Sequence, residues 1–283
     1  WVAPQMTLLF DRHLGVNWPR DQRLCDTWQG IETIDDAELW ETRQVLKARL
    51  LNFVRTRLVT QARRRNEPEW AIQKVMDALD PNALTIGFAR RFATYKRATL
   101  LLRDAERLAR ILSNKDRPLQ IIFAGKAHPH DNPGKELIRQ IIHFERRPEV
   151  RRRMVFVEDY DIAVARYLVQ GADVWLNTPR RPLEASGTSG MKATLNGAIN
   201  LSTLDGWWCE GYDGRNGWAI DSQAVSDEGV QDRRDGDVLY RVLEEEVVPA
   251  FYDRGADGVP LAWVRRVKAS LRTAATGFTT RRM

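Results

Sequence analysis

The residues best suited to chemistry lie between Glu184 and Gly197, in the string EASGTSGMKATLNG. Small residues and glycines precede a segment that can form a helix, so backbone N–H groups and a helix N-terminus can approach an anion closely. Glu184 can accept hydrogen bonds from a polyhydroxylated ligand, and Lys192 can act as a point charge or as an amine nucleophile. The spacing alone leaves three interpretations open: a phosphate cradle, a Schiff-base lysine, or an ordinary strand-turn-helix corner.

A second group of charged residues is the block RRFATYKR at residues 90–97. Its four cations stand where the sequence predicts the start of a helix, although helix N-termini favour acidic residues. Arginine suits a forked contact with phosphate, and lysine suits a point charge. The block is therefore either a group of cations placed to hold an anion or a helix that begins with basic residues, and local helix preference favours the first. Arg97 is the member of the block most expected to be structural.

Four separated blocks resemble one family, the α-glucan phosphorylases that act on glycogen, starch or maltodextrin. In chain order they are RRFATYKR (90–97), FAGK (123–126), EDYD (158–161) and EASGTSGMKATLNG (184–197), the last flanked by PRRPL and LSTLDGWWCEGYDGRNGWAI. The resemblance runs from Trp1 to about Ile220, and the remaining residues resemble nothing specific. In that family the lysine of the G-T-x-x-M-K string carries pyridoxal 5′-phosphate as an aldimine, which implies this role for Lys192.

The resemblance implies an activity: glucosyl transfer between the end of an α-1,4-glucan and inorganic phosphate, giving glucose 1-phosphate. Lys192, Arg91 and Lys96 are the implied catalytic residues, and Arg91 and Lys96 are expected to hold the substrate phosphate. Glu184, Ser186 and Gly187 are expected to bind the hydroxyls of the transferred glucose.

The same resemblance implies a set of cofactor contacts. Arg90 is expected beside the cofactor phosphate, with the N–H groups of Gly187 and Thr188 completing the cradle. Tyr160 is expected against the pyridine ring. Trp1 and Asn177 are further candidates for contact with the cofactor.

Two departures from the animal enzymes resemble the bacterial and archaeal branch of the family. This chain has Ala93-Thr94 where the animal enzymes have His-Glu, and G-T-S-G-M-K where they have G-T-G-N-M-K. Family members are about three times longer and have two Rossmann-like lobes in a glycosyltransferase-B architecture. The chain is therefore expected to be the C-terminal, cofactor-binding lobe and to have the N-terminal lobe as its partner. Without that lobe it is expected to fold but not to phosphorolyse glucan.

Two other functions remain open on the sequence. A nucleotide-sugar glycosyltransferase of the glycogen-synthase type shares the fold and the basic residues but carries no aldimine lysine. A non-catalytic fragment that binds carbohydrate is the second alternative.

The composition is that of a soluble globular protein. The chain has 283 residues, 43% hydrophobic and 29% charged, with a mean hydropathy of −0.46. No apolar run approaches the roughly 18 residues of a spanning helix, and the N-terminus lacks the features of a signal peptide, so we expect a cytoplasmic protein without a membrane partner. The net charge of +6 comes from short scattered clusters, which argues against nucleic acid. A homo-oligomer is possible.

The hydrophobic periodicity predicts an α/β fold, a Rossmann-like parallel sheet with helices on both faces. Expected strands lie at 83–88, 119–123, 154–157, 173–176 and 199–202, and expected helices at 35–58, 69–79, 95–113, 132–144, 162–170, 191–196, 232–252 and 260–275. Residues 1–34 are expected to be irregular with a brief helix. We divide the chain into an inter-lobe segment with helices (1–80), a pyridoxal-phosphate-binding core (81–222) and C-terminal helices (223–283).

Three further motifs are less specific. Lys126 follows a glycine turn but lacks a P-loop context, so we expect it to shape the rim of the site. His128, His130 and Asp131 have spacing that fits a loop better than a metal site. An aromatic group can form either a sugar-stacking platform or core and inter-lobe packing; its members are Trp207, Trp208, Tyr212 and Trp218.

Overall fold

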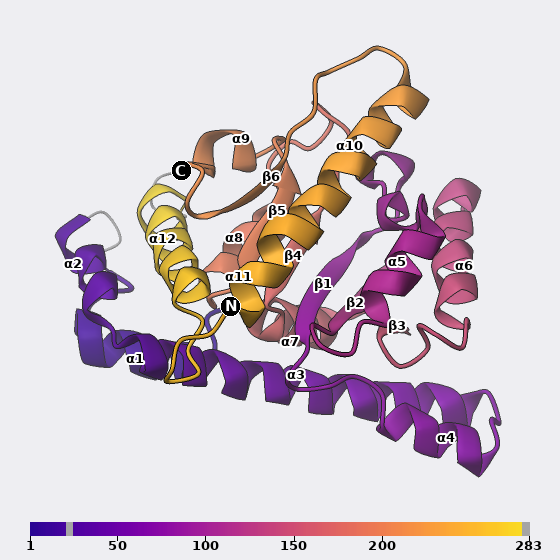
Figure 1. Cartoon of the computed structure of the whole chain (residues 1–283), viewed down its shortest axis with the longest axis horizontal. Helices are drawn as coiled ribbons and strands as arrows, with labels where there is room; N and C mark the ends of the chain where they lie inside the picture. The colour runs from indigo at the N-terminus through magenta and orange to yellow at the C-terminus, as the bar shows by residue number, and fades with distance from the viewer. Residues whose placement is uncertain (21–24, 279–283) are drawn as a thin grey trace.

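The structure, a computed structural model, describes residues 1–20 and 25–278. Its centre is a sheet of six parallel strands in the order β3-β2-β1-β4-β5-β6 (Figure 1). The strands are β1 (Leu84–Arg91), β2 (Leu119–Lys126), β3 (Met154–Val157), β4 (Val174–Asn177), β5 (Ile199–Thr203) and β6 (Gly217–Ile220). This confirms the predicted α/β class and the parallel sheet.

The strand order reverses at the centre of the sheet. The chain runs from β1 outward to β2 and β3, then returns to β4 on the other side of β1 and runs outward to β5 and β6. In open parallel sheets the crevice at such a reversal, beyond the carboxyl ends of the strands, is where ligands bind. The ends of β1 and β4 therefore mark the expected place for a site.

Alternating side chains of the strands fill two separate cores. Ile121 and Phe123 of β2 belong to a large cluster on one face, whereas Ile122 and Ala124 belong to a second cluster on the other. Period-two alternation with both sets buried is the pattern of a sheet covered on both faces. The helices on both faces are therefore required to shield the sheet from water.

Twelve α-helices are assigned among the described residues. They are α1 (Pro4–Leu14), α2 (Cys25–Gln29), α3 (Asp36–Arg64), α4 (Glu69–Met76), α5 (Ala105–Leu112), α6 (Asn132–Glu145), α7 (Ile162–Gly171), α8 (Thr188–Thr194), α9 (Trp208–Gly211), α10 (Glu228–Val242), α11 (Val248–Tyr252) and α12 (Leu261–Gly277). A π-helical turn at 243–247 joins α10 to α11, and short 3-10 turns lie at 30–33, 94–96 and 100–102.

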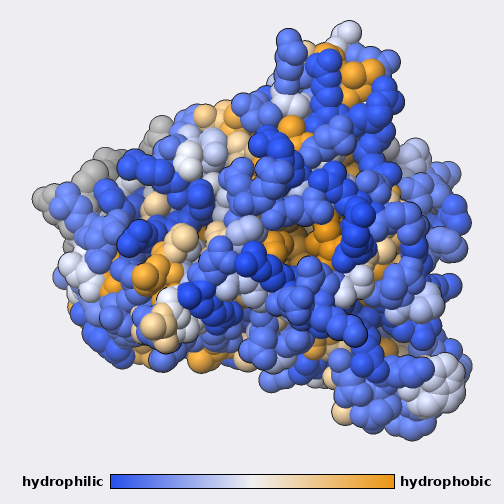
Figure 2. Space-filling view, viewed as in Figure 1, coloured by the Kyte–Doolittle hydropathy of each residue, from blue (hydrophilic) through white to orange (hydrophobic). Residues whose placement is uncertain are grey.

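The helices form layers around the sheet. In Figure 1, α5 and α10 lie in front of the strands, α6 lies at the right-hand edge, and the long α3 runs along the bottom. Helix α7 packs between α3 and the sheet. The face in view is mostly hydrophilic, with small, separated apolar patches (Figure 2).

Buried charges join α3 to the amino ends of the central strands. Lys47 forms an ion pair with Asp173, at 2.9 Å, just before β4, and both side chains are fully buried. Asp173 also accepts a hydrogen bond from the backbone N–H of Thr85 on β1. Arg43 donates to the backbone carbonyls of Gln170, Ala172 and Asn196. We call Arg43, Lys47 and Asp173 the amino-end cluster.

The structure differs from the sequence expectation in three places. The helix predicted over 95–113 is wrong over its first half, because 94–102 forms two 3-10 turns and only 105–112 is α-helical. Arg97, between those turns, adopts a left-handed conformation (φ 45°), which a continuous helix cannot include. Strand β6 and the short α9 were not anticipated, and the N-terminal region holds the 11-residue α1 in addition to α2.

No helix in the described part of the chain is both long and apolar enough to cross a membrane.

Candidate functional site

The ends of β1 and β4 bring two buried polar residues to the point where the strand order reverses. Arg90 is the penultimate residue of β1 and Asn177 is the last residue of β4. Both side chains are buried, yet Arg90 Nε and Asn177 Oδ1 lack a hydrogen-bond partner among the described residues. A buried polar atom without a partner costs roughly 1–3 kcal/mol, so a ligand that bonded to these two atoms would recover that cost.

A carboxylate lies between two of the predicted phosphate-binding cations. Glu184 Oε2 is 3.1 Å from Arg90 Nη1 and 2.8 Å from Lys96 Nζ, and all three side chains are largely buried. The segments that carry them are about 90 residues apart in the sequence, so the fold creates this group, which we call the switch-point cluster. Burial lowers the pKa of Arg90, and the charge of Glu184 opposes that effect.

The turn that carries Glu184 is held by a residue that sequence reasoning missed. Asp205 is buried, and its carboxylate accepts hydrogen bonds from the backbone N–H groups of Glu184 and Gly206 at 2.9 Å each. The carbonyl of Ser186 accepts a bond from the Trp207 backbone N–H at 2.8 Å. Asp205 lies in the segment LSTLDGWW. An aspartate followed by glycine is typical of a turn, and this pattern could have identified Asp205 from the sequence.

Gly187 and Gly190 are needed for different reasons, the first for its backbone conformation and the second for close packing. Gly187 precedes α8 with φ 80°, a left-handed conformation that glycine adopts without strain. Gly190, inside α8, faces Asn200 and Trp207, and a Cβ there would lie 2.6 Å from Asn200 Oδ1. A larger residue at 190 would therefore push α8 away from β5. Thr188, the first residue of α8, is exposed.

Lys192 lies in α8 against an aromatic ring. Its Nζ is 4.5 Å from the centre of the Trp1 ring. Asn196 fixes Trp1 here, because its Nδ2 donates to the carbonyls of both Trp1 and Lys192. Half of the Trp1 surface remains exposed, so the ring borders the lysine without enclosing it.

Tyr160 is close enough to Arg90 for their charges to interact. Burial raises the pKa of the Tyr160 phenol, and the positive charge of Arg90 opposes this rise. The turn before Tyr160 is tied to the end of α3, where Arg64 and Arg65 pair with Glu158. Tyr160 is half-buried and packs against the second core cluster.

Two other predicted site residues, Arg91 and Ser186, do not join the switch-point cluster. Arg91 is exposed at the end of β1, and because successive strand residues project to opposite faces it points away from the side of Arg90. Ser186 is half-buried beside Glu184. The structure thus brings together Arg90, Lys96 and Glu184, and it leaves Arg91 outside this group.

Arg97 has the structural role expected for it. Its guanidinium donates to the carbonyls of Thr178 and Pro179 at 2.9 Å each and pairs with Asp235 at 2.6 Å. Thr178 in turn donates to the carbonyl of Lys96. Arg97 therefore fixes the backbone that presents Lys96.

The aromatic group belongs to the interior. Trp207, Trp208 and Trp218 are buried, and Trp208 Nε1 donates to the carbonyl of Trp218, so the packing interpretation is confirmed and an open stacking platform is wrong for these three rings. Tyr212 is half-buried and packs against Trp208.

The histidine loop has a helix-capping role. Asp131 is the N-cap of α6 and accepts a bond from the backbone N–H of Gly134 at 2.8 Å. No group of three or more metal-ligating side chains gathers within residues 1–20 and 25–278. Lys126 is exposed at the end of β2, opposite Arg91.

The residues at this site fit a phosphorylated aromatic aldehyde. Such a cofactor needs a lysine amine, donors for its phosphate and a surface for its ring. Lys192 would supply the amine, and Trp1 and Tyr160 would supply aromatic surfaces. Arg90 retains an unpaired buried N–H, which would be free to donate to a phosphate.

Comparison with known proteins supplies the family. The profile of the carbohydrate phosphorylase family matches residues 3–212. This chain belongs to the carbohydrate phosphorylase family. A maltodextrin phosphorylase of Thermococcus litoralis is 46% identical over 100% of this chain, which covers 33% of that protein. A glycogen phosphorylase of Aquifex aeolicus is 45% identical over 100% of this chain and 41% of its own length. A glycogen phosphorylase of Mycobacterium tuberculosis is 47% identical over 96% of this chain and 31% of its own.

The family membership confirms the resemblance inferred from the four sequence blocks. It also favours a phosphorylase over a synthase that uses nucleotide sugars. The chain spans about a third to two fifths of the length of these relatives.

Proposed function

We propose that this chain is the cofactor-binding part of a pyridoxal-phosphate-dependent α-1,4-glucan phosphorylase. The observation that carries the proposal is the switch-point cluster of Arg90, Lys96 and Glu184, which lies beside the turn into α8. Relatives named glycogen and maltodextrin phosphorylase match the chain along its whole length. The substrates we propose are the non-reducing end of an α-glucan and inorganic phosphate, with glucose 1-phosphate as the product.

The cofactor contacts that we propose use the residues expected from the sequence. Lys192 would hold the aldehyde carbon, and Trp1 and Tyr160 would border the ring. Arg90 and the N–H groups of Gly187 and Thr188 would hold the phosphate, and Asn177 would offer its unpaired carbonyl oxygen. When bound, the cofactor supplies a phosphate with a second ionisation near pH ~6, which can exchange a proton with a neighbouring phosphate at neutral pH.

Two phosphates held side by side repel each other, and the cations at the site oppose that repulsion. Lys96 is buried beside Glu184 and would hold the substrate phosphate as a point charge. Arg91 is exposed at the rim and would complete the grip from outside, in a two-lobed enzyme whose other lobe closes over the site. Fixed cations in a site shielded from water stabilise such a pair of anions far better than water does.

The transfer itself replaces one C–O bond by another. The bond between glucosyl C1 and the glycosidic oxygen breaks, a phosphate oxygen bonds to C1, and the proton of the phosphate passes to the leaving oxygen. Glu184 would accept hydrogen bonds from the glucosyl hydroxyls, with Ser186 and Gly187 beside it. Because Glu184 also contacts Arg90 and Lys96, one carboxylate would align the sugar with both cations.

We further propose that the active unit has two lobes in a glycosyltransferase-B arrangement, acts in the cytoplasm and uses an N-terminal lobe as its partner. The three-segment division at residues 80 and 222 belongs to the same proposal. Without the other lobe, the substrates would be neither oriented nor shielded from water, so we expect the isolated chain to be inactive.

A chimera tests this function. Residues 1–283 are joined to the N-terminal part of the Aquifex aeolicus glycogen phosphorylase and supplied with pyridoxal phosphate, maltoheptaose and inorganic phosphate. We expect glucose 1-phosphate from the chimera and none from residues 1–283 alone or from a Lys192→Ala chimera. A folded chimera that binds the cofactor and forms no product contradicts the proposed activity.

A further inference from the structure

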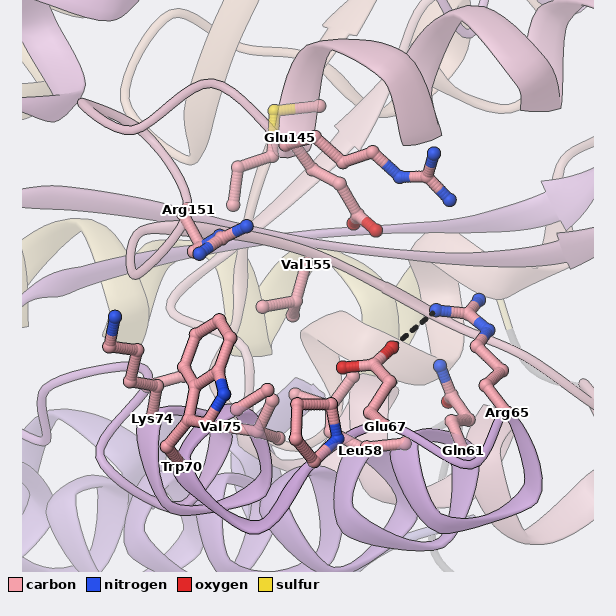
Figure 3. Close-up of a pocket in the computed structure, with 16 residues that line it drawn as sticks. Leu58, Gln61, Arg65, Glu67, Trp70, Lys74, Val75, Glu145, Arg151 and Val155 are labelled. Atoms are coloured by element: carbon pink, nitrogen blue, oxygen red, sulfur yellow. Dashed lines mark ion pairs between the residues drawn. The ribbon is translucent and has the colours of Figure 1, made fainter.

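A cavity far from the switch-point cluster opens at the free edge of the sheet. It has a volume of about 340 Å³ and lies between β3, the end of α6 and the helices α3 and α4. Figure 3 shows Trp70 and Val75 rising from α4 toward Val155 of β3, with Arg151 and Glu145 approaching from the opposite side. We call this space the edge pocket. Its volume falls within the range of about 300–1,000 Å³ that is typical of small-ligand sites.

The floor of the edge pocket is aliphatic and its rim carries one large ring. Leu58, Val75 and Val155 line the floor. Trp70 stands at the rim with 60% of its surface exposed, which is unusual for a tryptophan beside an apolar cavity. A flat or aliphatic ligand body would cover both the ring and the floor.

The hydrogen-bonding groups inside the pocket are already in use. Both amide atoms of Gln61 bond to the β3 edge, Nε2 to the Phe156 carbonyl and Oε1 to the Glu158 N–H. Glu145 accepts a bond from the Phe156 N–H at 2.6 Å. A sugar needs several free donors and acceptors around it, so the pocket is poorly suited to carbohydrate.

Three cations that line the pocket have no acidic partner within the described residues. Lys74 Nζ lies 4.7 Å from the centre of the Trp70 ring, and in the described part of the chain no acidic side chain pairs with Lys74, Arg146 or Arg151. Burial raises the pKa of Glu145 to about 8, so its carboxyl is mostly uncharged at pH 7 and adds little repulsion to an anion. Glu67 also lines the pocket and pairs with Arg65 at 3.7 Å, so the charge that remains at the mouth of the pocket is positive.

We propose that the edge pocket binds a small anion with an apolar body of one or two rings. The body lies on the aliphatic floor against Trp70, and its carboxylate, sulfonate or phosphate group faces Lys74 and Arg151. This site is separate from the proposed phosphorolysis, and the two proposals can fail independently.

The test uses residues 1–283 and the fluorescent anion 1-anilinonaphthalene-8-sulfonate at pH 7. We expect one saturable site. Each of the variants Lys74→Glu and Arg151→Glu should weaken binding by about tenfold, since reversing one charged contact changes affinity by at least that much. Trp70→Ala should also weaken binding, and Trp70→Phe should restore most of it. The matched control Lys115→Glu, on an exposed loop, should bind like the wild type.

Two further measurements make the proposal falsifiable. The uncharged analogue N-phenyl-1-naphthylamine should bind at least tenfold more weakly than the anion, and maltoheptaose should not compete. Circular dichroism confirms that each exposed-residue variant folds. Equal affinity for the charged and uncharged probes, equal loss in Lys74→Glu and Lys115→Glu, or competition by maltoheptaose would overturn the assignment.

Discussion

Two buried charged clusters lie at opposite ends of the same sheet and differ in one respect. The amino-end cluster joins α3 to the starts of β1 and β4, and the switch-point cluster lies where β1 and β4 end. Both contain basic side chains with a single acid. They differ in whether their polar atoms have partners.

The amino-end cluster is complete. Lys47 bonds to Asp173 and to the carbonyl of Ala83, and Arg43 bonds to three backbone carbonyls. Burial lowers the pKa of Arg43 to about 10, which leaves the guanidinium charged at neutral pH. Nothing in this cluster requires a further group.

The switch-point cluster is incomplete. Arg90 Nε and Asn177 Oδ1 are buried without partners in the described structure, although Glu184 contacts two cations nearby. The contrast shows that burial of charge does not by itself mark a functional site. Unsatisfied atoms at the carboxyl ends of the two strands where the strand order reverses do so more specifically.

The largest expected effect comes from breaking the complete cluster. Lys47→Ala leaves Asp173 buried without its counter-ion and should lower the free energy of unfolding by about 3–5 kcal/mol. Urea unfolding followed by circular dichroism measures this change. Lys115→Ala, an exposed control, should change it by less than ~0.5 kcal/mol. A loss below ~1 kcal/mol in Lys47→Ala would contradict a structural role for the pair.

Arg97→Ala should have the next largest effect on stability. It removes donors from the carbonyls of Thr178 and Pro179 and leaves Asp235 buried with only neutral partners. We expect a loss of about 2–4 kcal/mol in the same unfolding assay. Arg110→Ala, at an exposed position, serves as the matched control. Equal stabilities of the two variants would contradict a structural role for Arg97.

Mutation of the switch-point cluster should weaken cofactor binding and leave the free energy of unfolding almost unchanged. Arg90→Ala should weaken pyridoxal phosphate binding by about tenfold or more, because a charged hydrogen bond contributes roughly 1.5–3 kcal/mol. Its unfolding free energy should change by less than ~1 kcal/mol, since Lys96 still pairs with Glu184. Titration of each variant with the cofactor measures the affinity, and Arg91→Ala is the neighbouring control. Arg90→Ala and Arg91→Ala proteins with the same cofactor affinity would contradict the assignment.

The smallest expected change in stability comes from Glu145, a buried carboxyl outside both clusters. Burial raises its folded-state pKa to about 8, above the ordinary value of 4.5, so the folded state keeps a proton that the unfolded state loses. Stability should therefore fall as pH rises from ~4.5 to ~8 and then level off. Glu145→Gln should gain about 1.4 kcal/mol in stability relative to wild type as the pH rises from ~6 to ~7, because one pH unit inside that window corresponds to about 1.4 kcal/mol. Parallel stability curves for the two proteins would show that Glu145 does not titrate in this way.

The periodic core was predictable from sequence, and the exceptions have local causes. Short apolar strands alternating with amphipathic helices specify a doubly covered parallel sheet. The false helix start at 95 arose because residues 94–102 have ordinary helix propensity. The contacts of Arg97 with Thr178, Pro179 and Asp235 override that propensity, and such long-range contacts are invisible in a local pattern.

The sequence identified most residues of the candidate site, but it did not predict which of them contact one another. The motif identified Glu184 and Lys96, but their direct contact depends on the β4–α8 loop folding back onto the β1 turn. Asp205 was missed because its role appears only once its carboxylate meets the Glu184 backbone. The outward position of Arg91 follows from the two-residue period of β1, which the sequence already implied.

The central proposal is that Lys192 in α8 carries the cofactor. Residues 1–283 are incubated with pyridoxal phosphate, reduced with borohydride and digested, and the peptides are mapped by mass spectrometry. We predict a single stoichiometric phosphopyridoxyl group on Lys192 and none at this position in the folded Lys192→Ala protein, with other lysines modified only in trace amounts. Modification spread over surface lysines, with Lys192 no more labelled than Lys115, would contradict the claim.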